Sequence, residues 1–240
     1  MITFSLWVSL GASFGLWQIA RNSPDKSTEV HVAWGWIGLI CALFGARMAY
    51  VVLNLDYFNQ NRLQSLAFWE GGLTWYGALA GGLVACLGLA IWHNQPFFQY
   101  LDRLFHLLPP ISITAWLGCW WGGCDCFIPV IRDATSAAHT NCLLFGQSSG
   151  FPYHAFIALL LTGYYFWLDN WFSSRQPLPA GRYSALGLAG FGIVQWISTF
   201  FVMDLQPEWA GFSYNAWAAL ACFGIGLILL TGSHLFRKNP

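Results

Sequence analysis

Charged side chains are scarce in this sequence. Asp, Glu, Lys and Arg make up 8% of its 240 residues, ten acidic and ten basic, whereas a soluble domain carries about 25%. Hydrophobic residues make up 57% and the mean hydropathy is +0.51. Most of the outer surface must therefore face lipid. The absence of a basic block argues against a nucleic-acid partner, and the 18% aromatic content argues against disorder.

Several common signals are also missing. The sequence has no P-loop, no Gly-x-Gly-x-x-Gly and no Ser-His-Asp pattern. Residues 1–20 lack the positively charged start of a cleavable signal peptide and are apolar throughout. We therefore expect the first apolar segment to be retained as a membrane span.

Seven apolar segments are long enough to cross a membrane, which takes about 20 residues for roughly 30 Å of hydrocarbon. Their apolar runs are continuous rather than alternating, which favours helices over a barrel. We expect one all-α domain over residues 1–240, a polytopic membrane protein with seven transmembrane helices. The predicted spans are residues 2–20, 30–54, 73–93, 101–123, 153–172, 184–204 and 216–236.

The Lys and Arg residues of the connections predict the orientation. If the N-terminus lies outside and the C-terminus in the cytoplasm, only Arg62 and Arg132 fall outside, as the positive-inside rule requires. Seven basic residues are then cytoplasmic: Arg21, Lys26, Arg103, Arg175, Arg182, Arg237 and Lys238.

The outer segment after the second span has an amphipathic pattern. Its larger apolar side chains, with Arg62 among them, recur at near-helical spacing. We predict an interfacial helix over about residues 55–70. The apolar positions are Leu55, Phe58, Leu66 and Trp69.

Arg47 is a charged residue inside the second predicted span. A charge is costly there, so such a residue is a functional-site hypothesis by default. A guanidinium forks well onto phosphate, which points to an anionic lipid headgroup. The alternatives are that Arg47 reaches the interface or pairs with Asp56 or Glu70. Glu70 and Asp204 lie at outer span boundaries and are candidate proton acceptors.

Four cysteines gather at the outer end of the fourth span and in the loop after it: Cys119, Cys124, Cys126 and Cys142. The spacing C-x4-C-x-C matches none of the usual zinc or iron–sulfur spacings, so we predict no metal and no cofactor. Because the outer compartment is oxidising, the main interpretation is a disulfide from Cys142 to Cys124 or Cys126, or inert packing of these cysteines. Thiol redox or metal handling is the alternative.

Six stretches follow one another in an order typical of one membrane-enzyme family. They are GARMAY with LDYF (45–58), WEGGLTWYG (69–77), AWLGCWWGGCDCF (115–127), FPYHAF (151–156), GRYSALGLAGFGIVQWISTFF (181–201) and SYNAWAALACFGIGLILL (213–230). Together they resemble the prolipoprotein diacylglyceryl transferases. These bacterial membrane enzymes move diacylglycerol from phosphatidylglycerol onto the lipobox cysteine of a preprotein.

The resemblance implies a multi-pass protein of the bacterial plasma membrane. Its partners would be phosphatidylglycerol or a similar anionic lipid and a prelipoprotein. Arg47 would bind the lipid phosphate. Tyr76, which stands where the family has a histidine, would act as a hydrogen-bond donor, and Glu70 would lie near the acceptor substrate.

The sequence departs from the family at several site positions. These are Phe4 for a tyrosine, Trp116 for the signature arginine, Cys119 for an asparagine, Cys124 for an acidic residue, Gln195 for an arginine and Thr199 for a glutamate. A single donor to developing negative charge is worth about 10²–10³ in rate, so the lost cations are expected to weaken catalysis. Two hypotheses follow: a diverged diacylglyceryl transferase, or an inactive member of the same fold that binds lipid or serves in a membrane complex.

Overall fold

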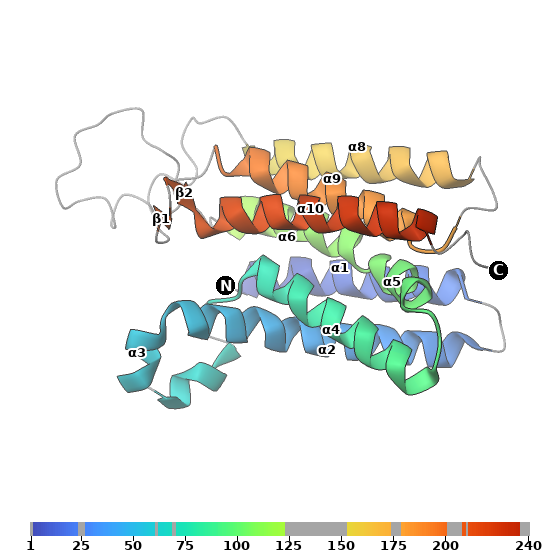
Figure 1. Cartoon of the computed structure of the whole chain (residues 1–240). Coiled ribbons are helices and arrows are strands. Elements are labelled where there is room, and N and C mark those ends of the chain that lie inside the picture. The colour runs from blue at the N-terminus through green and yellow to red at the C-terminus, as the bar shows by residue number, and fades with distance from the viewer. Residues whose placement is uncertain are drawn as a thin grey trace. The chain divides into compact units, whose positions relative to one another are not determined.

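The computed structural model describes residues 2–23, 27–60, 62–68, 71–122, 153–173, 179–200, 208–209 and 211–235. These residues form helices joined by turns, together with one small β-hairpin (Figure 1). The chain divides into two compact units. One unit holds residues 12–108, and the other holds residues 1–11 together with 109–240.

The 12–108 unit is built on two long helices, α2 (Thr28–Leu53) and α4 (Trp75–His93). It also holds the second half of α1 (Ile2–Arg21), the short helix α3 (Leu55–Gln60), the 3-10 helix η2 (Arg62–Leu66) and α5 (Phe97–Phe105). Within the segment predicted as one interfacial helix, the structure therefore has two shorter elements. The side chain of Leu63 in η2 is 90% exposed, which suits a segment that meets lipid headgroups.

Glycines let α2 and α4 approach closely (Figure 1). A Cβ placed on Gly77 would lie 2.5 Å from the carbonyl oxygen of Gly45, and one on Gly81 would overlap the carbonyl of Cys41. Small residues four apart allow such contact between membrane helices. A Cβ on Gly82, by contrast, would meet nothing within 4 Å. Gly77 and Gly81 therefore face α2, and Gly82 does not take part in this contact.

The prediction of one span over residues 101–123 is wrong in the structure. Two helices occupy this stretch, α5 and α6 (Leu108–Gly122). Pro109 lies in the first turn of α6, and in a continuous helix its ring would clash with the carbonyl of the residue four positions earlier. The polar side of α5 is held within the 12–108 unit, because Arg103 donates from Nη1 to Nε2 of His31 on α2 at 2.7 Å.

The second unit contains α6, α8 (Tyr153–Ser173), α9 (Arg182–Ser198) and α10 (Tyr214–Leu235). Helices α9 and α10 interlock through glycines. A Cβ on Gly226 would lie 2.6 Å from the backbone nitrogen of Ala189, and one on Gly192 would lie 2.6 Å from that of Phe223. On α8, Ile157 lies in the buried core of the unit.

A short β-hairpin precedes α10, which the sequence patterns did not predict. Strand β1 (Glu208–Trp209) pairs antiparallel with β2 (Phe212–Ser213). Gly211 between them has a φ of +80°, a conformation that glycine adopts at little cost.

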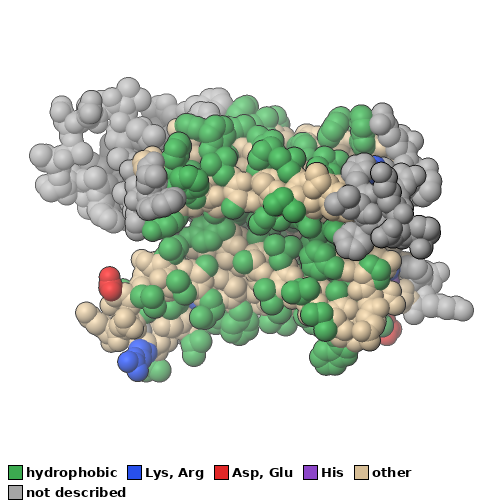
Figure 2. All heavy atoms as spheres, in the orientation of Figure 1, with side chains coloured by type: hydrophobic (Ala, Val, Ile, Leu, Met, Phe, Trp, Pro, Cys, Tyr) green, Lys and Arg blue, Asp and Glu red, His purple; other side chains and the backbone are tan. Residues whose placement is uncertain are grey.

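Large apolar side chains lie on the outside of both units, as on Ile91 and Trp92 of α4. In Figure 2 hydrophobic side chains spread along the described helices, and the visible acidic and basic side chains lie near helix ends. Within the described ranges, three helices are long and apolar enough to cross a membrane: Thr28–Leu53, Trp75–His93 and Tyr214–Gly232. A membrane-embedded helical protein accounts for this surface, while the count of seven spans and the orientation stay predictions.

Candidate functional site

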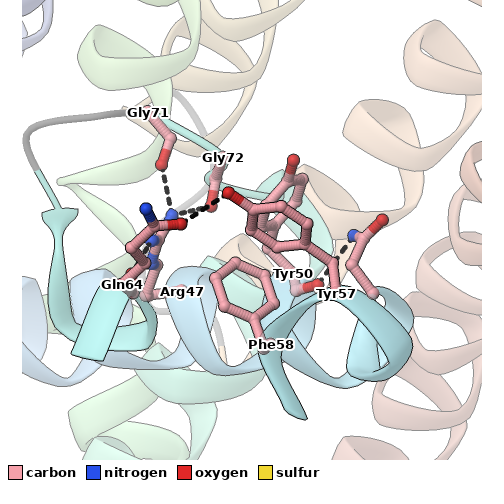
Figure 3. Close-up of a pocket in the computed structure, with 8 residues that line it drawn as sticks. Arg47, Tyr50, Tyr57, Phe58, Gln64, Gly71 and Gly72 are labelled. Carbon is pink, nitrogen blue, oxygen red and sulfur yellow. Dashed lines mark hydrogen bonds between the residues drawn. The ribbon is translucent and has the colours of Figure 1, made fainter. Parts of the chain in front are cut away.

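A pocket of about 340 Å³ lies at the C-terminal end of α2 (Figure 3). Its walls come from the last turns of α2, from α3, from η2 and from the residues just before α4. The residues that line it are Arg47, Tyr50, Asn54, Tyr57, Phe58, Gln64, Gly71 and Gly72. All of them belong to the 12–108 unit, so one compact unit builds the whole pocket.

Arg47 is 3% exposed, and its guanidinium is surrounded by backbone carbonyl oxygens. Nε donates to Ser65 at 3.0 Å, and Nη2 donates to Gln64 at 2.5 Å. Nη1 donates to Gly71 at 2.5 Å and to Gly72 at 3.4 Å. Four of the five N–H groups of the guanidinium can be assigned in this way. Arg47 therefore joins two separate stretches of backbone to α2, as the dashed lines in Figure 3 show for the glycines.

The acceptor carbonyls depend on an unusual backbone conformation. Gly71 and Gly72 have φ values of +87° and +67°, the left-handed region that glycine enters without strain. A Cβ on Gly72 would lie 2.5 Å from Cε1 of Tyr50 and 2.9 Å from Nη1 of Arg47. The glycine pair thus brings the backbone close enough for its carbonyls to meet the guanidinium.

The positive charge of Arg47 has no carboxylate partner among the described residues. Its hydrogen bonds with described residues go to carbonyl dipoles, which solvate the charge without neutralising it. The pairing with Asp56 considered from the sequence is not formed, and Glu70 lies outside the described residues. The rings of Tyr50 and Phe58 lie 5.7 and 5.4 Å from the guanidinium carbon, within cation–π range. Among the described residues that line the pocket, Arg47 is the one charged side chain.

Neutral polar groups complete the pocket. The hydroxyl of Tyr57 donates to Oε1 of Gln64 at 2.5 Å, which links α3 to η2. Nδ2 of Asn54 donates to the carbonyl of Tyr50 at 2.9 Å. Sequence reasoning missed these four residues as site components. Tyr50 alone had a local signal, since it follows Arg47 by three positions and so shares its helix face.

Of the two predicted catalytic residues, Tyr76 and Glu70, Tyr76 lies within the described ranges, in the first turn of α4. Its hydroxyl is buried, and its ring lies edge-on to Trp75 with centroids 5.6 Å apart. It is not among the residues that line the pocket. The joint role of Tyr76 and Arg47 therefore stays a prediction.

The positions that replace family site residues lie in the other unit. The ring of Trp116 packs against Tyr153 and His154, with centroids 6.2 and 5.6 Å away. Gln195 is buried on α9, and its backbone carbonyl accepts from the hydroxyl of Ser198 at 2.6 Å.

The other positions that replace family site residues lie on α1, on α6, at the end of α9 or outside the described residues. Phe4 lies on α1 beside Gly118, whose added Cβ would be 3.2 Å from Cδ2 of Phe4. Cys119 is half-buried on α6, and Thr199 follows the end of α9. Cys124, Cys126 and Cys142 lie outside the described residues, so the predicted disulfide stays a prediction. In the described part of the chain, no three His, Cys, Asp or Glu side chains come together as a metal site.

Fold and site together define a class: an all-helical membrane protein with a buried arginine in a pocket beside the end of an apolar helix. Residues 1–231 match the model of the prolipoprotein diacylglyceryl transferase family. The chain therefore belongs to that family, which confirms the resemblance seen in its motifs.

Curated bacterial relatives carry the name phosphatidylglycerol–prolipoprotein diacylglyceryl transferase. The relative from Polynucleobacter asymbioticus is 27% identical over 84% of this chain and 75% of its own length. The relative from Idiomarina loihiensis is 28% identical over 88% and 79%. The relative from Pasteurella multocida is 29% identical over 82% and 73%.

Proposed function

We propose that this protein is a diacylglyceryl transferase of the bacterial plasma membrane, acting on phosphatidylglycerol and a prelipoprotein cysteine. The observation that carries the proposal is the positive charge of Arg47, which has no carboxylate partner among the described residues and is buried in a pocket of a chain that belongs to this family. The proposal includes seven membrane spans, with the N-terminus outside and the C-terminus in the cytoplasm. The pocket at the end of α2 then faces the outer leaflet.

The reaction sets clear demands on the side chains. The cysteine thiol loses its proton, and its sulfur bonds to the glyceryl carbon of the lipid. The bond from that carbon to the phosphate oxygen breaks, and glycerol phosphate leaves with the electron pair. Positive charge near that oxygen lowers the barrier. In the proposal Arg47 attracts the lipid phosphate, Tyr76 donates a hydrogen bond, and Glu70 accepts the thiol proton.

The second candidate is an inactive member of the fold that binds lipid or serves as a membrane-complex subunit. One specific observation favours it. Trp116, which stands where the family has its signature arginine, packs among the rings of Tyr153 and His154 instead of presenting a cation. A site that lacks one donor to developing charge is expected to be slower by about 10²–10³-fold.

The test is transfer of labelled diacylglycerol from phosphatidylglycerol to a lipobox peptide by the purified protein in detergent. An active family member serves as the positive control. Arg47→Ala is compared with Arg62→Ala, which removes an exposed charge from η2 outside the pocket. Transfer that is lost in Arg47→Ala and kept in Arg62→Ala supports the transferase. No transfer by the parent, beside an active control, leaves the inactive member as the function.

A further inference from the structure

We infer that Arg47 is a positioning residue: it holds residues 62–68 and 71–72, here called the clamped segment, on α2 and thereby sets the shape of the pocket. The inference rests on the proposed function only in taking the pocket as a lipid site. It goes beyond phosphate attraction, because it assigns a task to the hydrogen bonds that Arg47 donates to the protein's own backbone.

The first support is the distribution of the hydrogen bonds. The guanidinium donates to Gln64 and Ser65 in one part of the clamped segment and to Gly71 and Gly72 in the other, so it bonds both parts at once. A rigid guanidinium fork can hold several acceptors at once. A lysine ammonium at the same place is a compact charge on a flexible stem and cannot reproduce the fork.

The second support comes from the acceptors. Gly71 and Gly72 both have positive φ, and Gly72 has no room for a Cβ beside Tyr50 and Arg47. This backbone shape brings the carbonyls onto the guanidinium. An alanine at Gly72 would disturb the clamp while the charge of Arg47 stays in place.

The third support is the composition of the pocket. Tyr50 comes from α2, whereas Gln64, Gly71 and Gly72 come from the clamped segment. The pocket therefore exists only while the segment lies on α2. Two backbone amides report on the segment. Thr74, just after it, donates to the carbonyl of Ala46 on α2 at 3.2 Å, which measures the contact with α2 directly. Ala67 donates to the carbonyl of Gln64 within the segment at 3.0 Å, which measures the local structure that the clamp holds.

The experiment is amide hydrogen exchange by mass spectrometry on the full chain in nanodiscs that contain phosphatidylglycerol, together with phosphatidylglycerol binding by native mass spectrometry. Arg47→Lys keeps the charge and loses the fork. Gly72→Ala keeps the arginine and disturbs its acceptors. Arg62→Ala is the matched control, since it removes a charge from the same segment without touching the clamp.

We expect Arg47→Lys and Gly72→Ala each to speed exchange at Ala67 and Thr74 by about tenfold or more, which corresponds to about 1.4 kcal/mol of lost protection. Phosphatidylglycerol binding should weaken in parallel. Peptides of α9 and α10 should exchange at the parent rate, because a general loss of stability would affect them as well. Arg62→Ala should match the parent in both measurements.

Parent-like exchange in Arg47→Lys would overturn the inference, since charge alone would then suffice. Parent-like exchange in a folded Gly72→Ala would overturn it too. If Gly72→Ala is not monodisperse, Gly71→Ala, with its φ of +87°, takes its place and the same criterion applies. Local exchange that rises as expected in a protein without transfer activity supports the clamp and refutes only the proposed reaction.

Discussion

Two adjacent glycines on α4 allow a matched test of how this helix packs on α2. We predict that Gly81→Ala destabilises the protein and that Gly82→Ala does not. A Cβ on Gly81 would overlap the carbonyl oxygen of Cys41 and lie 2.8 Å from its carbon and 3.1 Å from Cα of Ala42. These are backbone atoms, so the helices must separate. A Cβ on Gly82 meets nothing within 4 Å.

The magnitude follows from the difference between the two variants. Both gain the same helix propensity, about 0.8–1.0 kcal/mol for alanine over glycine, so this contribution cancels. What remains is the cost of overpacking in Gly81→Ala, about 1–3 kcal/mol. For a chain of this size 1 kcal/mol shifts Tm by about 2–4 °C, so the two variants should melt about 2–12 °C apart.

The assay is thermal unfolding in one detergent, followed by tryptophan fluorescence and by the monodisperse fraction on size exclusion. The sequence contains 15 tryptophans, which gives a strong signal. Because Gly45 on α2 lies two positions before Arg47, separation of the helices should also weaken phosphatidylglycerol binding in Gly81→Ala. Equal melting temperatures for the two variants, or a lower one for Gly82→Ala, would refute the described α2–α4 contact.

Two further predictions concern the other unit. Gly226→Ala should lower Tm, because its Cβ would lie 2.6 Å from the backbone nitrogen of Ala189. Gly224→Ala should leave Tm unchanged, because its Cβ would meet nothing within 4 Å. Equal melting temperatures for the two variants would contradict the described α9–α10 packing. Tyr164→Phe removes a hydroxyl that donates to a backbone carbonyl of α9 at 2.6 Å and should cost about 0.5–1.5 kcal/mol, which denaturant unfolding can measure. An unchanged midpoint would argue against that hydrogen bond.

The helices follow directly from local sequence. Apolar runs of about 20 residues predicted elements close to α1, α2, α4, α8 and α10, because a continuous apolar run needs no distant partner to form a helix in lipid. The fourth predicted span is wrong because the prediction followed the apolar composition of residues 101–123 and took no account of Pro109. Pro109, in the first turn of α6, prevents one continuous helix through this stretch. The hydrogen bond of Arg103 with His31, 72 positions apart, places α5 with α2. Such a contact leaves no local pattern.

The sequence by itself determined that the chain is apolar and helical, that it carries the family motifs, and that Arg47 is a charge in an apolar helix. Only the tertiary structure decided what that charge contacts. Its partners are backbone carbonyls 17 to 25 positions away, and every residue type has a carbonyl, so no residue pattern can mark them. The orientation of Gly81 toward α2, and of Gly82 away from it, was likewise decided by the packing of two helices and not by either glycine alone.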